Sequence, residues 1–238
     1  NKAGEDLRRL IDNILDLSKI EAGQLEMQVE WVDLPQLMQD LVDLMQPQFA
    51  EKGLKLKLYI DDNAPDQIET DSDKLRQIMK NFLGNAVKFT SAGEVILELR
   101  QAESPYAVAL QVRDEGIGIP REKHQAIFEA FKQADGSTSR RFGGTGLGLS
   151  ISNQLAAMLG GEILLESEPG QGALFGLLLP ARQEAANVSK MPSRKGIAEQ
   201  SAETTTRLPS ADFNGMDVLL VDQDVQQLLR LSQVLESW

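Results

Sequence analysis

The sequence DEGIGIP, residues 114–120, combines one acidic residue with two glycines at alternating positions. Because glycine has no side chain, the backbone at Gly116 and Gly118 can approach a flat ligand closely. The carboxylate of Asp114 can accept a hydrogen bond from an exocyclic amine at the edge of such a ligand, and adenine carries such an amine. The same pattern is common in a turn after a strand, so this stretch alone leaves both a nucleotide site and an ordinary turn open.

A second polar pattern lies on the predicted helix 71–90, DSDKLRQIMKNFLGNAVKFT. Apolar residues at helical spacing predict its buried face: Leu75, Ile78, Met79, Phe82, Ala86 and Phe89. Asn81, Asn85 and Lys88 stand at positions i, i+4 and i+7 and form a polar line beside that face. Amide oxygens can ligate Mg²⁺, and amide and ammonium groups can face phosphate oxygens. Taken alone, such a line is more often a solvated helix face, so this alternative stays open.

A third segment, residues 143–159, places Gly144, Gly146 and Gly148 at the start of a predicted helix. A helix N-terminus offers unpaired N–H groups and the positive end of the helix dipole, which suit phosphate. The segment has no G-K-[ST] of a Walker loop, and no strand precedes it as in a dinucleotide fingerprint. The preceding residues 132–142 predict a mobile loop whose arginines could close on phosphates, or a surface loop without that role.

The composition narrows the class of protein. A formal net charge of -12 over 238 residues, with a pI near 4.6, disfavours a nucleic-acid partner or an anionic membrane surface. The absence of cysteine excludes disulfides, thiolate metal sites and a cysteine nucleophile, and is compatible with a reducing cytosol. No apolar run approaches the roughly 20 residues of a membrane span. The single histidine, His124, is predicted to be an ordinary surface side chain. Because the chain begins within a predicted helix, we interpret it as a piece of a longer protein.

The remaining pattern predicts alternating helices and strands. Residues 1–23 predict a helix with a broad apolar stripe, which belongs in a helical bundle or packs on its own domain. The stretch 24–34 predicts a strand whose buried face carries Leu25, Met27, Val29 and Trp31. Residues 35–52 predict a helix with Leu37, Leu41, Leu44 and Met45 inward. Further strands are expected at 54–60, 94–100, 106–113, 163–167 and 173–179, and a short helix at 122–131.

Four segments together resemble the conserved boxes of sensor histidine kinases. NFLGNAVKFT resembles the N box, DEGIGIP the first glycine box, IFEAFKQAD the F box and GGTGLGLSIS the second glycine box, in the family's order. The stretch DLSKIEAGQL is similar to the second helix of the family's dimerisation and phosphotransfer hairpin. MDVLLVDQD, near the end, resembles the opening of a receiver domain, as in hybrid kinases.

The resemblance implies an α/β fold: a two-layer Bergerat-type sandwich of the GHKL superfamily, in which helices back a mixed sheet. It also implies four parts. Residues 1–23 would be the second hairpin helix, 24–182 the ATP-binding domain, 183–215 a linker, and 216–238 the first βα unit of a receiver-like domain.

The resemblance further implies ATP and Mg²⁺ as ligands. Asp114 would bind adenine, Asn85 would hold Mg²⁺, and Asn81 and Lys88 would meet phosphates. The other residues implied at the ATP site are Gly116, Gly118, Ile119, Phe128, Phe131, Arg141, Gly144, Thr145, Gly146, Leu147 and Gly148. The gyrase, mismatch-repair and chaperone branches carry a glutamate where Asn81 stands. An amide cannot act as a general base, so phosphoryl transfer is favoured over direct hydrolysis.

Two departures from the family pattern qualify this interpretation. The phosphoacceptor histidine would lie on a helix preceding this chain, so no catalytic residue is assigned within it. The receiver-like segment has Gln223 between Asp222 and Asp224, where receivers usually present adjacent acids, which puts its metal binding in doubt.

Two functions follow from the sequence. The first is a hybrid histidine kinase that transfers the γ-phosphoryl group of Mg-ATP to a histidine outside the chain. The second is a kinase-like regulator that binds nucleotide and controls another kinase by direct interaction. Expected partners are the phosphoacceptor helix, a response regulator or phosphotransfer protein, another histidine kinase, and a second copy in the full-length protein. The chain is expected in the cytoplasm, with a parent that could be anchored in the inner membrane.

Overall fold

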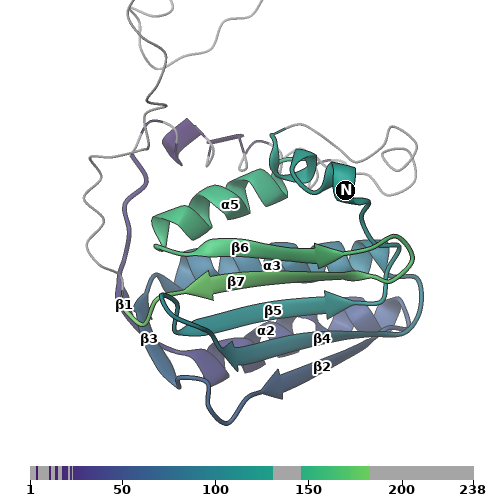
Figure 1. The fold of residues 1–238 in the computed structure, drawn as a ribbon, viewed down its shortest axis with the longest axis horizontal. Helices are drawn as coiled ribbons and strands as arrows, with labels where there is room; N and C mark the ends of the chain where they lie inside the picture. Colours follow the sequence, from purple (N-terminus) through teal and green to yellow (C-terminus); the bar gives the residue numbers. More distant parts are fainter. Residues whose placement is uncertain are drawn as a thin grey trace, which may run out of the picture. The chain divides into compact units, whose positions relative to one another are not determined.

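The computed structural model describes residues 24–130 and 146–182, together with residues 4, 11, 14, 15, 18–20 and 22. Its main feature is a five-stranded sheet, shown in Figure 1 with helices α2 (Leu34–Glu51) and α3 (Ser72–Phe89) behind it. A third helix, α5 (Gly148–Met158), packs against α3 and the edge of the sheet. This arrangement confirms the predicted two-layer α/β fold. Among the described residues, no helix is long and apolar enough to cross a membrane.

The strand order across the sheet is β2 (Lys55–Ile60), β4 (Glu94–Gln101), β5 (Val108–Asp114), β7 (Ala173–Leu179) and β6 (Glu162–Ser167). β2 and β4 run parallel, and every other neighbouring pair is antiparallel, so the sheet is mixed as predicted. Asp114 is the last residue of the middle strand and lies opposite Val95 on one side and Ala173 on the other. The register therefore fixes Asp114 at one end of the sheet.

A second, smaller sheet pairs β1 (Glu30–Asp33) with β3 (Gln67–Thr70) in antiparallel fashion. The amide of Glu69 on β3 also donates to the carbonyl oxygen of Ala181, at 3.1 Å. The segment that enters the domain and the segment that leaves it are thus both attached to β3.

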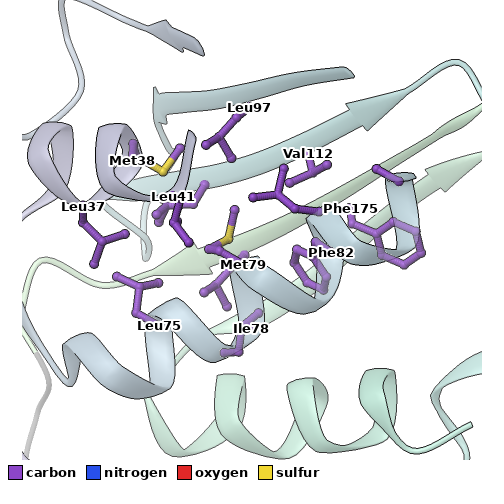
Figure 2. Packing of buried hydrophobic residues seen from close by; sticks show 14 of the residues in the cluster. Leu37, Met38, Leu41, Leu75, Ile78, Met79, Phe82, Leu97, Val112 and Phe175 are labelled. Carbon is purple, nitrogen blue, oxygen red and sulfur yellow. The ribbon is translucent and has the colours of Figure 1, made fainter. Parts of the chain in front are cut away.

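The core lies between α2, α3 and the sheet. Figure 2 shows side chains of the two helices directed toward Leu97 of β4, Val112 of β5 and Phe175 of β7. The predicted face of α3 is confirmed from Leu75 to Ala86, since its apolar residues there are at most 1% exposed. Phe82 contacts Phe175 with ring centroids 5.4 Å apart, which joins the middle of α3 to the sheet.

The prediction for residues 24–34 was wrong in its extent and in half of its buried face, since Leu25 and Met27 pack against the core but Val29 and Trp31 are exposed. Only Glu30–Asp33 form a strand, with Val32 6% exposed and Trp31 56% exposed. Alternation shows that two faces exist but not which of them meets the core. The ring of Trp31 is instead approached by the guanidinium of Arg182, 5.8 Å from its centroid, so an outward aromatic residue still has a partner.

Two helix predictions also need correction. On α2, Leu44 is 56% exposed, whereas Met38 and Phe49 are fully buried in its place. The expected helix at 122–131 is replaced by two 3₁₀ helices, η1 (Arg121–Lys123) and η2 (Ala126–Phe128). So short a segment gains little from helix propagation, and 3₁₀ turns are common in such connections.

The C-terminus of α3 is capped by a lysine from another helix end. The ammonium of Lys52 donates to the carbonyl oxygens of Val87, of Lys88 at 3.1 Å and of Thr90 at 2.8 Å. These carbonyls have no partner within the helix, and a cation also complements the negative end of the helix dipole.

Replacing Lys52 with methionine is therefore expected to lower the free energy of unfolding by about 1 kcal/mol, since several charge-assisted hydrogen bonds are lost at a solvent-accessible position. Urea unfolding of the 238-residue chain measures this change. Lys57→Met is the matched control, because Lys57 is exposed and pairs only with Glu94 on the sheet surface. Equal stability of the two variants would contradict the capping role.

Candidate functional site

Helix α3 is anchored at its N-terminus by Asp71, whose side chain accepts from the amides of Asp73 at 3.1 Å and Lys74 at 3.0 Å. The second oxygen of the same carboxylate accepts from the amide of Gln28 at 2.8 Å. Burial alone would raise the pKa of Asp71, but the Gln28 and Lys74 hydrogen bonds and the Lys74 charge hold that pKa below its usual value. The buried carboxylate of Asp71 therefore joins the segment before β1, through Gln28, to the N-terminus of α3.

The middle of α3 meets the start of α5 at Asn81. The amide nitrogen of Asn81 donates to the hydroxyl of Ser152 at 2.9 Å. A Cβ at Gly148, the first residue of α5, would overlap the Asn81 side chain, with its Cγ at 3.1 Å. Glycine at this position thus lets the N-terminus of α5 lie directly against α3.

Asn85 and Lys88 lie farther along the same helix, and their polar groups make few contacts with the described residues. Within the described residues, the Asn85 side chain takes part in no hydrogen bond, and Lys88 takes part in no ion pair. Desolvation lowers the pKa of Lys88, whose ammonium lies 4.7 Å from the centroid of the Phe89 ring. A half-buried ammonium without a carboxylate partner is stabilised by an anionic ligand.

The C-terminus of α3 meets the 114–120 loop. A Cβ at Gly116 would stand 2.8 Å from the carbonyl oxygen of Phe89 and 2.6 Å from the Asp114 carboxylate. Asp114 is 8% exposed, and its carboxylate accepts from the Gly116 amide at 2.7 Å. Burial raises the pKa of Asp114, while the Gly116 and Ala173 amides and the Thr90 hydroxyl act against this rise. A buried carboxylate of this kind is a candidate for reading a polar ligand edge.

The glycines of this loop are required by the protein's own backbone. Gly118 has φ +68, and a Cβ there would overlap the carbonyl oxygen of Glu168 and approach its carbonyl carbon to 2.7 Å. We predicted that Gly116 and Gly118 leave room for a ring. The structure gives a different reason for both, because the neighbouring backbone already occupies the space of a side chain.

Two segments far apart in the sequence, the start of α5 and the 114–116 loop, therefore converge on helix α3. The start of α5 lies against Asn81, and the 114–116 loop lies against Phe89 and Thr90 at the helix end. Asn85 and Lys88 lie between these two contacts, and the line from Asn81 to Lys88 is about 10 Å long at the rise of an α-helix.

Residues 70–183 match the family model described as "Histidine kinase-, DNA gyrase B-, and HSP90-like ATPase". The domain belongs to this ATPase family. The signal transduction histidine-protein kinase BarA of Escherichia coli is 39% identical over 177 residues, covering 73% of this chain and 19% of BarA. The sensor histidine kinase AruS of Pseudomonas aeruginosa is 35% identical over 223 residues, covering 92% of this chain and 21% of AruS. The chain thus spans about a fifth of the length of these curated relatives.

Solved structures agree with this assignment. Full-length ShkA in complex with AMPPNP aligns with a TM-score of 0.69 and 36% identity, covering 78% of this chain and 38% of ShkA. The histidine kinase AdeS of Acinetobacter baumannii aligns with a TM-score of 0.61 at 21% identity, which supports the fold of the ATPase domain alone.

The predicted site residues of the ATPase domain fall into four groups. Asn81, Asn85, Lys88, Asp114, Gly116, Gly118 and Gly148 are brought together along α3 and the adjoining loop, as described above. Leu147 is fully buried in the core, and Ile119 and Phe128 pack against the core from partly buried positions. Gly146 has φ +72 just before α5. Four predicted site residues lie outside the described residues: Phe131, Arg141, Gly144 and Thr145. Most of the predicted helix 1–23 and all of residues 183–238 also lie outside them.

His124, which we predicted to be an ordinary surface side chain, is only partly exposed. Its Nε2 lies 3.0 Å from the carbonyl oxygen of Ile119, and the residue is partly buried. This contact gives the only histidine of the chain a structural role beside the glycine loop.

Sequence reasoning missed the residues that hold the ATPase site in place through hydrogen bonds to its helix, side chains and loop. Lys52 caps α3, Ser152 holds Asn81, and Ser167 accepts a hydrogen bond from the amide of Ile119 at 2.8 Å. None of these residues stands in a recognisable spacing with its partner, since the contacts join positions 35 to 71 residues apart. Only the fold brings them together.

No ready-made metal cage exists in the part of the chain that the structure describes, because no three His, Cys, Asp or Glu side chains cluster there. Mg²⁺ usually takes one or two protein oxygens and completes its shell with water and phosphate oxygens. The unengaged amide oxygen of Asn85 beside the Lys88 ammonium fits this kind of site.

Proposed function

We propose that this chain contains the catalytic part of a hybrid sensor histidine kinase, which binds Mg-ATP and passes its γ-phosphoryl group to a histidine outside the chain. The observation that carries the proposal is the placement of Asn85 and Lys88. They lie on α3 between two glycine segments, with polar groups that the described residues leave unengaged and with a lysine pKa lowered by burial.

Each end of the site has its own task. The Asp114 carboxylate accepts a hydrogen bond from the adenine amine, and its hydrogen bonds to backbone amides hold it in place. Lys88 and the N-terminus of α5 face the phosphates. Because Ser152 uses the amide nitrogen of Asn81, we assign to Asn81 the role of holding α5 at the site. Asn85 would hold the Mg²⁺ ion, which when bound neutralises phosphate charge and orients the transferred group.

The described residues bind and orient ATP, and none of those at the proposed site acts as a general base. Asn81 is an amide, and the His124 ring is held against the Ile119 carbonyl oxygen. Phosphoryl transfer depends mostly on positioning and charge stabilisation, so a separate histidine presented to the γ-phosphate is a sufficient acceptor. ShkA was crystallised with AMPPNP, an ATP analogue, which supports nucleotide binding by its similar domain here.

The partners of the whole protein follow from this proposal. They are the helix that carries the acceptor histidine, a second copy of the protein, and a response regulator or phosphotransfer protein downstream. Because ATP is available in the cytoplasm, we place this part of the protein there.

The decisive experiment uses a longer chain that includes the helix preceding residue 1. Incubation with γ-labelled ATP and Mg²⁺ is expected to give acid-labile label on a histidine. Asn85→Ala should abolish labelling, whereas Asn63→Ala should not, because Asn63 is exposed in the turn after β2 and its side chain bonds to Asp61. Failure of the unsubstituted protein to bind ATP or ADP with Mg²⁺ would overturn the proposal. Binding without label would instead support a regulator that acts by direct interaction.

The affinity for MgADP is expected to decrease at alkaline pH, starting below the ordinary lysine pKa of about 10.4. Burial lowers the pKa of Lys88 in the unliganded protein, and phosphate oxygens raise this pKa again on binding. At a pH between the pKa of Lys88 in the unliganded protein and its pKa in the complex, Lys88 takes up a proton when MgADP binds. The affinity therefore decreases as the pH rises. Calorimetric titrations between pH 7 and 10 measure the effect.

Two variants of α3 show whether Lys88 causes the pH dependence of MgADP binding or whether it is a general effect of pH on the protein. Lys88→Met is expected to bind MgADP about tenfold more weakly and to lose most of this pH dependence, because one charge-assisted contact is absent. Lys80 is exposed on α3, and Lys80→Met should retain both the affinity and the pH profile. A Lys88→Met profile identical to that of the unsubstituted chain would contradict the assignment.

A further inference from the structure

The 114–120 loop is held from behind by the turn that joins β6 to β7, residues 168–172. Ser167, the last residue of β6, connects the two. Its hydroxyl oxygen accepts from the amide of Ile119 at 2.8 Å and donates to the carbonyl oxygen of Gly172 at 2.7 Å. The amide of Gly170 in the same turn donates to the carbonyl oxygen of Ile117 at 2.8 Å. Three hydrogen bonds therefore fix the position of the 114–120 loop relative to the 168–172 turn.

The two segments also touch through bare backbone. A Cβ at Gly118 would overlap the backbone of Glu168, and a Cβ at Gly172 would overlap the backbone of Asp114. Ala173, which follows the turn, lies opposite Asp114 in the sheet, and its amide favours the ionised carboxylate. At Gly118 and Gly172 no side chain lies between the two backbones to absorb a movement, so a displaced turn displaces the loop.

The Ser167 hydroxyl is the one side chain among these contacts, and it acts as acceptor and donor at once. Its removal leaves the Ile119 amide and the Gly172 carbonyl without their partner, at partly buried positions. Unpaired groups of this kind favour a shifted backbone in which water can reach them.

We propose that Ser167 is a positioning residue that sets the preference of this site for adenine. The inference rests on the proposed function, because it assumes that Asp114 binds the base. The hydrogen bond between Asp114 and an exocyclic amine depends strongly on distance and angle, so a small shift of the loop weakens it. Contacts of phosphate with α3 and α5 do not pass through this loop and should persist.

The test compares ADP with IDP, which carries an oxygen in place of the exocyclic amine. In calorimetric titrations of the 238-residue chain with Mg²⁺, Ser167→Ala is expected to weaken ADP binding about tenfold and to leave IDP binding nearly unchanged. Ser167→Thr keeps a hydroxyl and should restore the preference for ADP. Gln171→Ala is the matched control, since Gln171 lies in the same turn but its side chain bonds only to Glu168.

Each outcome separates the positioning role from a purely structural one. A variant that loses stability but keeps the ADP-to-IDP ratio of the unsubstituted chain would overturn the inference and leave the proposed function intact. No ADP binding by the unsubstituted chain would overturn both. If Ser167→Ala does not fold, Ser167→Cys takes its place, because a thiol has a similar shape and is a weak acceptor. The same decrease in the ratio is then expected.

Discussion

Asp114→Asn is expected to weaken MgADP binding by about 10- to 100-fold, the loss corresponding to a charge-assisted hydrogen bond and an unpaired donor. The substitution keeps the size of the side chain but can place an amide nitrogen against the Gly116 amide, which donates to the Asp114 carboxylate at 2.7 Å. The Gly116 and Ala173 amides both act to lower the pKa of Asp114 against the rise caused by burial, so both favour a carboxylate at this position. An asparagine cannot accept from both of them and from the adenine amine as well. Calorimetric titration of the folded variant measures the change.

The neighbouring acid provides the control for this prediction. Glu115 is exposed, and its carboxylate accepts from the amide of Glu94 at 3.1 Å. Glu115→Gln should therefore bind MgADP within about twofold of the unsubstituted chain, since exposed charges contribute little. The proposed adenine contact would be refuted by an Asp114→Asn variant that is folded and binds MgADP as tightly as Glu115→Gln does.

Gly172→Ala is expected to lower the free energy of unfolding by about 3 kcal/mol. About 1 kcal/mol arises because the residue has φ +79, where alanine is strained, and about 2 kcal/mol from the overlap of a new Cβ with the backbone. The Cβ would stand 2.8 Å from the carbonyl carbon of Asp114. Because this contact involves backbone on both sides, no side-chain rotation relieves it. Urea unfolding followed by a tertiary-structure signal measures the loss.

Gly170 lies in the same turn and provides the control. Substituting it shows what the positive φ costs when a new Cβ makes no close contact. It has φ +77, but a Cβ there would meet nothing within 4 Å. Gly170→Ala should therefore cost only about 1 kcal/mol, the part that comes from φ. Similar losses for the two variants would show that the contact between the turn and Asp114 is less close than described.

The sequence by itself determined the elements whose patterns are local. The buried face of α3 followed from helical spacing, because a continuous helix with one core face repeats its apolar positions regularly. The strand at 173–179 was predicted with its bounds, since a run of apolar residues between glycine-rich and proline-containing turns has few other interpretations. A single site that contains Asn85, Lys88 and Asp114 is implied by the resemblance of four segments to family boxes, and it stays a prediction.

Only the tertiary structure decided which side of a strand or helix meets the core and what supports the site. In β1, Val32 is buried and Trp31 is exposed, and the alternation of the sequence does not say which of these two faces meets the core. Lys52, Ser152 and Ser167 each bond to a residue remote in sequence, at a distance set by the packing of whole elements. Likewise the loop glycines are dictated by neighbouring backbone. Such contacts depend on three-dimensional proximity, which no local pattern of residues encodes.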